Sequence, residues 1–374
     1  MNNKADKKTF LRNSITFAVP ALIILTSLTI VLSRSRKNKI VKNNSNITLE
    51  SSVPLCRNYP IMGTWAEISL YGNRKTANQA MDEIYNSLNE INNACSRFKP
   101  ESELSQLNAT AAKKPFKCSK LLWNILVKSK YFYELSDGAF DITITPLMEL
   151  WGFYRKQNKI PSEKEIKKAL TLVGLNNVVF NPKNRSIFFK KIGIQLDLGG
   201  IAKGYAVDYA YSSINKYNIK SGVINLGGNI RFFPTPPPDK SYYSVGIRDP
   251  FQKNKLMDGT LKLVNRSLAT SGDYEQFIIL NNERFTHIIN PKTGYPIKDM
   301  AAVTIVANSA LICDALSTSV FINGVKFASK IHEQFPDIEI LVVKGYHDKP
   351  ETIKTFKIGK IWEVFKKNAS NLKY

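Results

Sequence analysis

The feature that most constrains this chain is an uncharged stretch from Asn13 to Ser33, because a run of this kind is not expected to form part of a globular domain. It is mostly apolar, and about 20 apolar residues suffice to cross a bilayer as a helix. A cleaved signal peptide is the alternative, but its apolar part is usually shorter and ends in small residues, whereas this stretch runs into the basic residues 34–37. We therefore expect an uncleaved signal anchor at residues 13–33, behind a short basic N-terminus at residues 1–12.

The rest of the chain divides into a tether and one large domain. Residues 34–55 are polar and follow neither a helical nor a strand period, which is typical of a linker. Of all 374 residues, 43% are hydrophobic, so residues 56–374 can build a substantial buried core.

Charge and the metal-binding residue types exclude several functions. The 53 Lys and Arg outnumber the 30 Asp and Glu, but beyond residue 50 the excess is spread thinly, whereas nucleic-acid-binding faces concentrate it. The four cysteines form no C-x-x-C motif, their spacing names no disulfide partners, and there are only three histidines. We expect no nucleic-acid partner, and any bound metal must be held mainly by oxygen.

Hydrophobic periodicity predicts an α+β fold. Apolar residues at helical spacing predict helices at 75–96, 121–135, 162–173, 202–217 and 310–321. Alternating or continuous apolar runs predict strands at 66–71, 178–180, 187–189, 194–198, 223–226, 244–247, 268–271, 277–280 and 302–306, with a last pair near 338–343. The strands and helices mix without strict alternation, which favours α+β over a doubly wound sheet.

Three segments carry residue types suited to chemistry. Asp197–Asp208 runs from a predicted strand through two glycines into a helix, so free N–H groups and Lys203 could hold a phosphate; a tight turn explains the glycines equally well. Asp314 and Thr318 lie four residues apart on a predicted helix, and such oxygens suit Mg²⁺. His287 is a lone histidine beside hydroxyl and acid groups, and a structural role is its alternative.

A fourth segment carries Asp141, Thr143 and Thr145 at period 2, close to an aromatic cluster. If this stretch is extended, all three side chains point to one side. Such a stripe could bind the edge of a heterocycle, or it could be an exposed strand face.

The order of these segments resembles the ApbE family of FAD:protein FMN transferases. The resemblance rests on eight motifs between about Tyr59 and Gly324: Met62-Gly63-Thr64, residues 96–108, Gly138-Ala139-Phe140-Asp141 with Trp151-Gly152-Phe153, residues 197–208, Asn225-Leu226-Gly227-Gly228, residues 270–274, His287 with residues 290–294, and residues 314–318. It implies a single T-fold-like α+β domain that binds FAD as substrate and Mg²⁺ as cofactor.

The resemblance also implies roles for individual residues. The family's Mg²⁺ ligands correspond to Asp314, Thr318 and the backbone carbonyl of Ala202. Lys203 would share the charge of the pyrophosphate, and His287 or Asp314 would accept the proton of the incoming hydroxyl. The expected FAD contacts are Met62, Phe98, Asn108 and Asp141.

The implied reaction transfers the FMN half of FAD to a Ser or Thr hydroxyl of a flavoprotein subunit of a membrane redox complex and releases AMP. The alternatives are hydrolysis of FAD to FMN and AMP, and a membrane-tethered flavin-binding protein without catalysis. Many family members are exported lipoproteins, and this chain has no lipobox cysteine. We therefore expect a single-pass protein of the bacterial inner membrane with its domain on the extracytoplasmic side.

Overall fold

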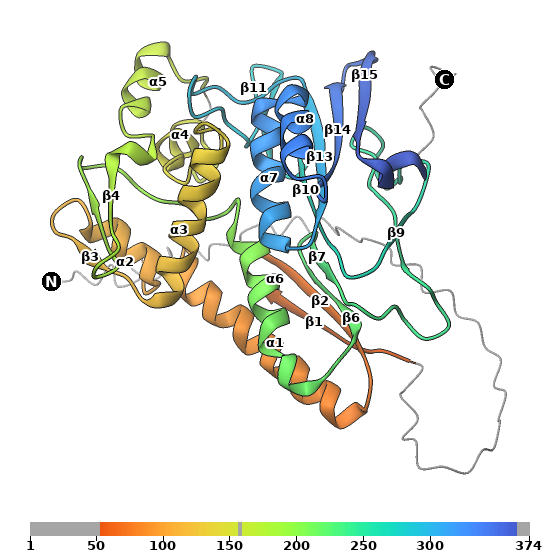
Figure 1. Cartoon of the computed structure of the whole chain (residues 1–374). Coiled ribbons are helices and arrows are strands. Elements are labelled where there is room, and N and C mark those ends of the chain that lie inside the picture. The colour runs from red at the N-terminus through yellow and green to blue at the C-terminus, as the bar shows by residue number, and fades with distance from the viewer. Residues whose placement is uncertain (1–52, 156–158, 365–374) are drawn as a thin grey trace, which may run out of the picture.

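The centre of the fold is an eight-stranded antiparallel sheet, seen in a computed structural model that describes residues 53–155 and 159–364 (Figure 1). Its strand order is β1-β2-β6-β7-β10-β13-β14-β15. The strands are β1 (Leu55–Ile61), β2 (Thr64–Tyr71), β6 (Ser221–Leu226), β7 (Asn229–Phe232), β10 (Ser267–Gly272), β13 (Met300–Ala307), β14 (Glu339–Tyr346) and β15 (Lys349–Ile358). Strands β2 and β6 are paired neighbours although they are far apart in the sequence.

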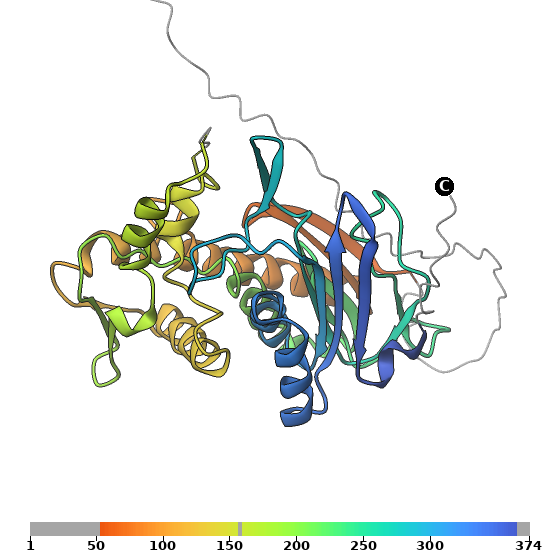
Figure 2. The same ribbon diagram turned by 90° about the horizontal axis from the view of Figure 1, so that it is seen from above.

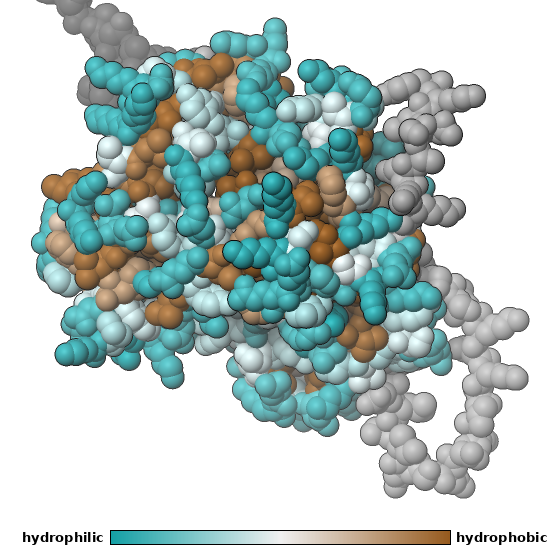
Figure 3. Space-filling view, turned by 45° about the horizontal axis from the view of Figure 1, so that its top comes forward, coloured by the Kyte–Doolittle hydropathy of each residue, from teal (hydrophilic) through white to brown (hydrophobic). Residues whose placement is uncertain are grey.

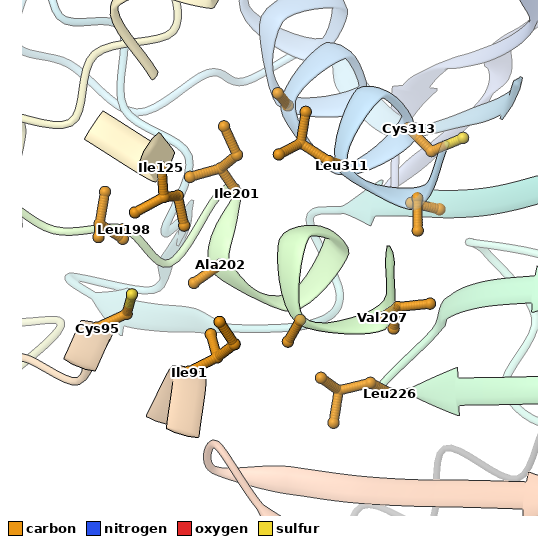
Figure 4. Close-up of a cluster of buried hydrophobic side chains, with 14 of the residues drawn as sticks. Ile91, Cys95, Ile125, Leu198, Ile201, Ala202, Val207, Leu226, Leu311 and Cys313 are labelled. Atoms are coloured by element: carbon orange, nitrogen blue, oxygen red, sulfur yellow. The ribbon is translucent and has the colours of Figure 1, made fainter. Parts of the chain in front are cut away.

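Helices cover one face of this sheet (Figures 1 and 2). They are α1 (Arg74–Cys95), α6 (Ala202–Ser213), α7 (Ala310–Asn323) and α8 (Val325–Gln334). α6 lies between α1 and α7 and packs on β6 and β7, so its small residues that face these neighbours are buried, namely Ala202, Gly204, Ala206 and Ala210. Ser212 of the same helix is exposed. Figure 4 shows this core, in which Ala202 and Val207 of α6 lie between Ile91 of α1 and Leu311 of α7.

The other face of the sheet has a cover of its own. Strands β8 (Tyr243–Val245) and β9 (Leu261–Leu263) form a separate two-stranded sheet, and a short 3₁₀ helix follows at Lys360–Val364. Their apolar side chains, with buried Trp362 among them, form a second core against the sheet. Because both faces are covered, every residue of β6 and β13 is buried, whereas β1 at the edge alternates.

A largely helical part of the chain lies between β2 and β6 in the sequence and beside the sheet in space (Figure 2). It contains α2 (Glu103–Thr110), α3 (Lys120–Leu135), α4 (Thr145–Leu150) and α5 (Glu163–Leu170), with a small sheet of β3 (Phe116–Lys117), β4 (Val178–Asn181) and β5 (Ser186–Phe189). The hairpin of β11 (Phe277–Leu280) and β12 (Glu283–Thr286) shares a third core with α4 and α5 through Leu147, Trp151 and Phe285.

Most of the predicted elements are present, and two predictions are wrong. Residues 194–198 form no strand, although Ile194, Leu196 and Leu198 are all buried. The predicted stripe at 141–145 is not extended, because Asp141 bonds to Thr143 two residues on and α4 begins at Thr145. The helix predicted at 202–217 ends at Ser213 and is followed by a short 3₁₀ turn, Asn215–Tyr217.

The described residues do not reach the predicted anchor. Residues 1–12 and 13–33, and the tether up to residue 52, lie outside them. Within 53–155 and 159–364, no helix has both the length and the apolar character needed to cross a membrane. The cysteines, all of them described, are unpaired: Cys56 is exposed, and Cys95, Cys118 and Cys313 are buried.

Candidate active site

The candidate active site begins where α6 and α7 touch. A Cβ on Gly204 would lie 2.7 Å from both the carbonyl carbon of Ala310 and the Cβ of Asp314, so only glycine allows this approach. The backbone N–H of Gly204 donates to Oδ2 of Asp314 at 2.8 Å. The contact places the Asp314 carboxylate beside the first turn of α6, which begins at Ala202.

A second contact ties the start of α7 to α6. Oδ1 of Asp208 accepts the N–H of Ala310 at 2.9 Å, and Oδ2 accepts the N–H of Leu311 at 3.0 Å and the hydroxyl of Ser309 at 2.5 Å. A carboxylate here satisfies N–H groups that the first turn of a helix leaves free. Asp208, about one turn further along α6 than Gly204, therefore also fixes the start of α7 against α6.

Hydroxyl groups surround the next turn of α7. Oγ of Ser271, on β10, lies 3.4 Å from Oγ1 of Thr318 and 2.8 Å from Oγ of Ser317. A Cβ on Gly200 would lie 3.5 Å from Oγ1 of Thr318, so the glycine run before α6 reaches the same place. Asp314 is only 6% exposed, and its burial raises the pKa of its carboxyl, while Lys203 and the N–H of Gly204 oppose the rise.

These atoms fit the predicted magnesium site in their chemistry. Asp314 and Thr318 supply a carboxylate and a hydroxyl, both hard oxygen donors, and Ala202 lies at the helix start beside them. Among the residues that the structure describes, no three His, Cys, Asp or Glu side chains gather as a metal cluster. A site with one carboxylate suits an ion that keeps several of its ligands from water or a phosphate.

His287 follows β12 directly and is oriented by one carbonyl. Its backbone N–H and its ring Nδ1 lie 3.1 Å and 2.9 Å from the carbonyl oxygen of Gln276. Since a carbonyl only accepts hydrogen bonds, Nδ1 carries the proton and Nε2 keeps a free lone pair. Burial lowers the pKa of His287 to about 4, and Lys203 contributes to this lowering, so the ring is neutral at pH 7.

Charged side chains face this histidine from neighbouring elements. Lys203 acts electrostatically on His287, Asp314 and Glu275, which places all four in one electrostatic neighbourhood. Nζ of Lys203 donates to the carbonyl oxygen of Gly199 at 3.2 Å. Desolvation by the surrounding protein raises the pKa of the Glu275 carboxyl, and the positive charges of Lys203 and Arg248 oppose the rise.

The segment before α6 connects this site to an aromatic patch. Oδ2 of Asp197 accepts the hydroxyl of Tyr154 at 2.5 Å and lies 3.6 Å from Nε of Arg97. The Arg97 guanidinium sits 3.8 Å from the ring centre of Tyr154 and 5.3 Å from that of Phe98. Phe98 is 73% exposed, so its ring is available for stacking. On the face of the molecule that Figure 3 shows, apolar residues are exposed in patches among hydrophilic ones.

Two other predicted flavin contacts have structural partners. The amide of Asn108 donates to the carbonyl of Leu196 at 2.9 Å and accepts the N–H of Leu196 at 2.8 Å, so it holds the segment that leads to Asp197. Met62 occupies the turn between β1 and β2 with a positive φ of 52°. The Gly227 turn lies alongside, because a Cβ there would meet the side chain of Thr64.

Asp141 lines a cavity of about 500 Å³ that contains none of the other predicted site residues. Its Oδ1 accepts the N–H and hydroxyl of Thr143 at 2.8 Å and 2.6 Å. Burial raises the pKa of Asp141 to about 6 despite these bonds. The neighbouring Phe140 connects the cavity to the α6–α7 site, since a Cβ on Gly200 would lie 3.2 Å from its ring.

Comparison with known proteins identifies the family of this chain. A sequence profile of the ApbE family matches residues 62–342. The chain belongs to the ApbE family. Its curated relatives include an FAD:protein FMN transferase of Klebsiella pneumoniae (strain 342), 27% identical over 77% of this chain and 88% of that protein. Another, from Treponema pallidum (strain Nichols), is 28% identical over 76% of this chain and 82% of that protein.

Solved structures show the same ApbE fold. An ApbE protein from Thermotoga maritima superposes with a TM-score of 0.74 at 29% identity, over 83% of this chain and 99% of that one. The flavin transferase ApbE from Vibrio cholerae gives a TM-score of 0.73 at 24% identity, over 84% of this chain and 99% of that one. The α+β class expected from the sequence is thereby confirmed.

In this ApbE-family chain the predicted residues fall into five places. Ala202, Lys203, Asp314 and Thr318 lie at the α6–α7 contact, and the electrostatic effect of Lys203 links His287 to them. Phe98 lies at the aromatic patch, Asn108 on Leu196, Asp141 at the cavity and Met62 in the β1–β2 turn. The sequence did not single out Ser271, Glu275, Arg97 or Tyr154. Ser271 was within the motif at residues 270–274, but its contact with α7 spans 46 residues and leaves no local signal.

Proposed function

We propose that this chain transfers the FMN part of FAD to a Ser or Thr hydroxyl of an acceptor protein, with AMP as the leaving group. Its family membership and the names of its relatives support the transferase activity. The observation that carries the proposal is the arrangement at α6 and α7, where an acid, hydroxyls and a cation gather beside a neutral histidine.

FAD brings a pyrophosphate with two negative charges. We propose that Lys203 and the first turn of α6 bind it, because helix N-termini attract anions and an adjacent cation adds to the attraction. Asp314, Thr318 and the Ala202 carbonyl would hold Mg²⁺, which when bound would neutralise charge on the phosphates as AMP departs. The exposed ring of Phe98 would stack on a ring of FAD.

The acceptor hydroxyl must lose its proton as it attacks phosphorus. His287 suits this step, because Gln276 holds the proton on Nδ1 and leaves Nε2 free to accept another. A base with a pKa of about 4 is weak, but the negative phosphates of bound FAD would raise it. Asp314 is the alternative acceptor. Its carboxylate is already engaged by Gly204, which favours His287.

The deciding experiment incubates the full chain with FAD, Mg²⁺ and an apo-flavoprotein subunit of a membrane redox complex. We expect the acceptor mass to rise by one FMN less one water, with one AMP released per acceptor. The control is the acceptor with its target hydroxyl residue changed to alanine. Release of free FMN and AMP without a mass increase indicates hydrolysis instead, and FAD binding without AMP indicates a flavin-binding protein.

We further propose that residues 13–33 anchor the chain in the inner membrane, with the domain outside the cytoplasm. The uncharged stretch and its basic flanks support this arrangement. Cys56 provides the test, because it is the one exposed cysteine of the four. A membrane-impermeant maleimide added to intact spheroplasts should label the wild type but not a Cys56→Ser variant. Labelling that requires lysis would contradict this topology.

A further inference from the structure

Asp273 connects three separate elements beside the candidate active site. It directly follows β10, and its backbone N–H donates to the carbonyl of Ala301 on β13 at 3.0 Å. Its Oδ2 accepts Nε2–H of His347, from the turn between β14 and β15, at 2.8 Å. Its backbone carbonyl accepts Nη2 of Arg284, on β12, at 3.1 Å.

The Asp273 carboxylate depends on these partners. The residue is only 8% exposed, and its Oδ1 has no hydrogen-bond partner among the described residues; Nη2 of Arg284 lies 3.7 Å away. A buried carboxylate that loses a partner is costly, so the surrounding structure must keep both in place. Phe251 supports His347 from the side, with the ring centres 5.1 Å apart.

These contacts hold the open end of the β11–β12 hairpin, where its two strands join the rest of the domain. Only two residues separate Asp273 from Gln276, whose carbonyl orients His287. On the other strand, Arg284 lies three residues before His287 and stacks over Phe277, 3.9 Å from its ring centre. Asp273 therefore holds both strands that carry the hydrogen bond between Gln276 and His287: the strand of Gln276 through the chain itself, and the strand of His287 through Arg284.

We propose that Asp273 and His347 are positioning residues that hold His287 in the Nδ1–H form, with Nε2 turned to the reacting hydroxyl. This role rests on the proposed transferase function, in which His287 accepts the proton. The family profile matches residues 62–342, so His347 lies outside it. The contact of His347 with Asp273 is therefore supplied by the hairpin of β14 and β15.

The test uses the full chain and the fact that it has only three histidines. In protein labelled with ¹⁵N-histidine, long-range ¹H–¹⁵N spectra report the tautomer of each ring. Wild-type His287 should be in the Nδ1–H form, and His347→Ala should turn it into a mixture with the Nε2–H form. His347→Gln, which keeps a donor for Asp273, should restore most of the wild-type spectrum.

Kinetics on the same variants supply the second readout. His347→Ala should lower kcat about 10- to 100-fold, the usual cost of losing a residue that orients a catalytic group, with KM for FAD changed less than about threefold. His332→Ala is the matched control, because its Nδ1 contacts the carbonyl of Ile338, away from the hairpin. It should leave kcat and the His287 tautomer unchanged.

The outcomes separate the two proposals. Wild-type protein that never flavinylates an acceptor contradicts the proposed function, while the tautomer of His287 still decides the inference. A His347→Ala variant with a wild-type tautomer at His287 overturns the inference, whether or not its kcat has fallen.

Discussion

Replacing Gly204 by alanine tests whether the contact between α6 and α7 builds the active site. The added Cβ would lie 2.7 Å from both the carbonyl carbon of Ala310 and the Cβ of Asp314. Ordinary contacts are about 0.7 Å longer, and neither neighbour can escape by changing rotamer, so the helices must separate. Such overpacking costs about 3 kcal/mol, from which the better helix propensity of alanine recovers about 1. We expect the free energy of unfolding to fall by about 2 kcal/mol.

We also expect Gly204→Ala to lower the rate of AMP release strongly. A shift of α7 moves Asp314 and Thr318 relative to Ala202, and a displacement near 1 Å in a catalytic group can cost about 100-fold in rate. Urea unfolding would give the stability, and AMP released from FAD in the presence of Mg²⁺ would give the rate. Ser212→Ala, on the exposed side of the same helix, is the control. If Gly204→Ala matches that control in both measurements, the contact does not constrain the site.

Three further substitutions test other parts of the structure. Asp314→Asn can still accept the N–H of Gly204, so it should remain folded by circular dichroism yet lose Mg²⁺-dependent AMP release at least about 100-fold; normal turnover would refute the metal assignment. The pKa of Asp141 is raised to about 6 in the folded protein, so the folded state binds the proton more tightly than the unfolded state. The free energy of unfolding should therefore fall by about 3 kcal/mol as pH rises from about 4 to 7. Urea titrations of Asp141→Asn should lack this contribution to the pH dependence of the unfolding free energy. Asp208→Ala removes the three bonds to the start of α7 and should cost about 2 kcal/mol of unfolding free energy, against less than about 0.5 for the exposed Asp258→Ala; equal losses would contradict the capping role.

Periodicity in the sequence predicted burial better than it predicted strand pairing. Ile194, Leu196 and Leu198 repeat at period 2 and are buried, as expected of a strand. The backbone N–H and carbonyl of Leu196 bond to the side chain of Asn108, and residues 194–198 pair with none of the described strands. A local pattern records which side chains face the core, whereas pairing depends on a partner 88 residues away.

The stripe at 141–145 failed for a local reason. An aspartate can bond to the backbone two residues ahead and so make a turn, which competes with extended structure. Asp141 does this with Thr143. By contrast, Asn73 and Ser162 cap α1 and α5, and these helices, which form through contacts between near neighbours, were predicted from their own residues.

The residues of the site were predictable mainly as motifs. Asp314 and Thr318 share one helix face, and that relation follows from helical spacing. The contacts of Ser271 with α7 and of His347 with Asp273 join residues 46 to 74 positions apart. Nothing in the local sequence marks such pairs, because the sheet brings them together only after it has formed.

The pairing of β2 with β6 has a consequence for the order of folding. Tyr71 pairs with Ser221, so the helical part of the chain must be made before the sheet can grow past its first hairpin. At a synthesis rate of roughly 5–20 residues per second, the edge of β2 waits on the order of 10–30 s for its neighbour. We expect this interval to be when the nascent chain is most prone to pair with other strands, and when a chaperone would most improve its yield.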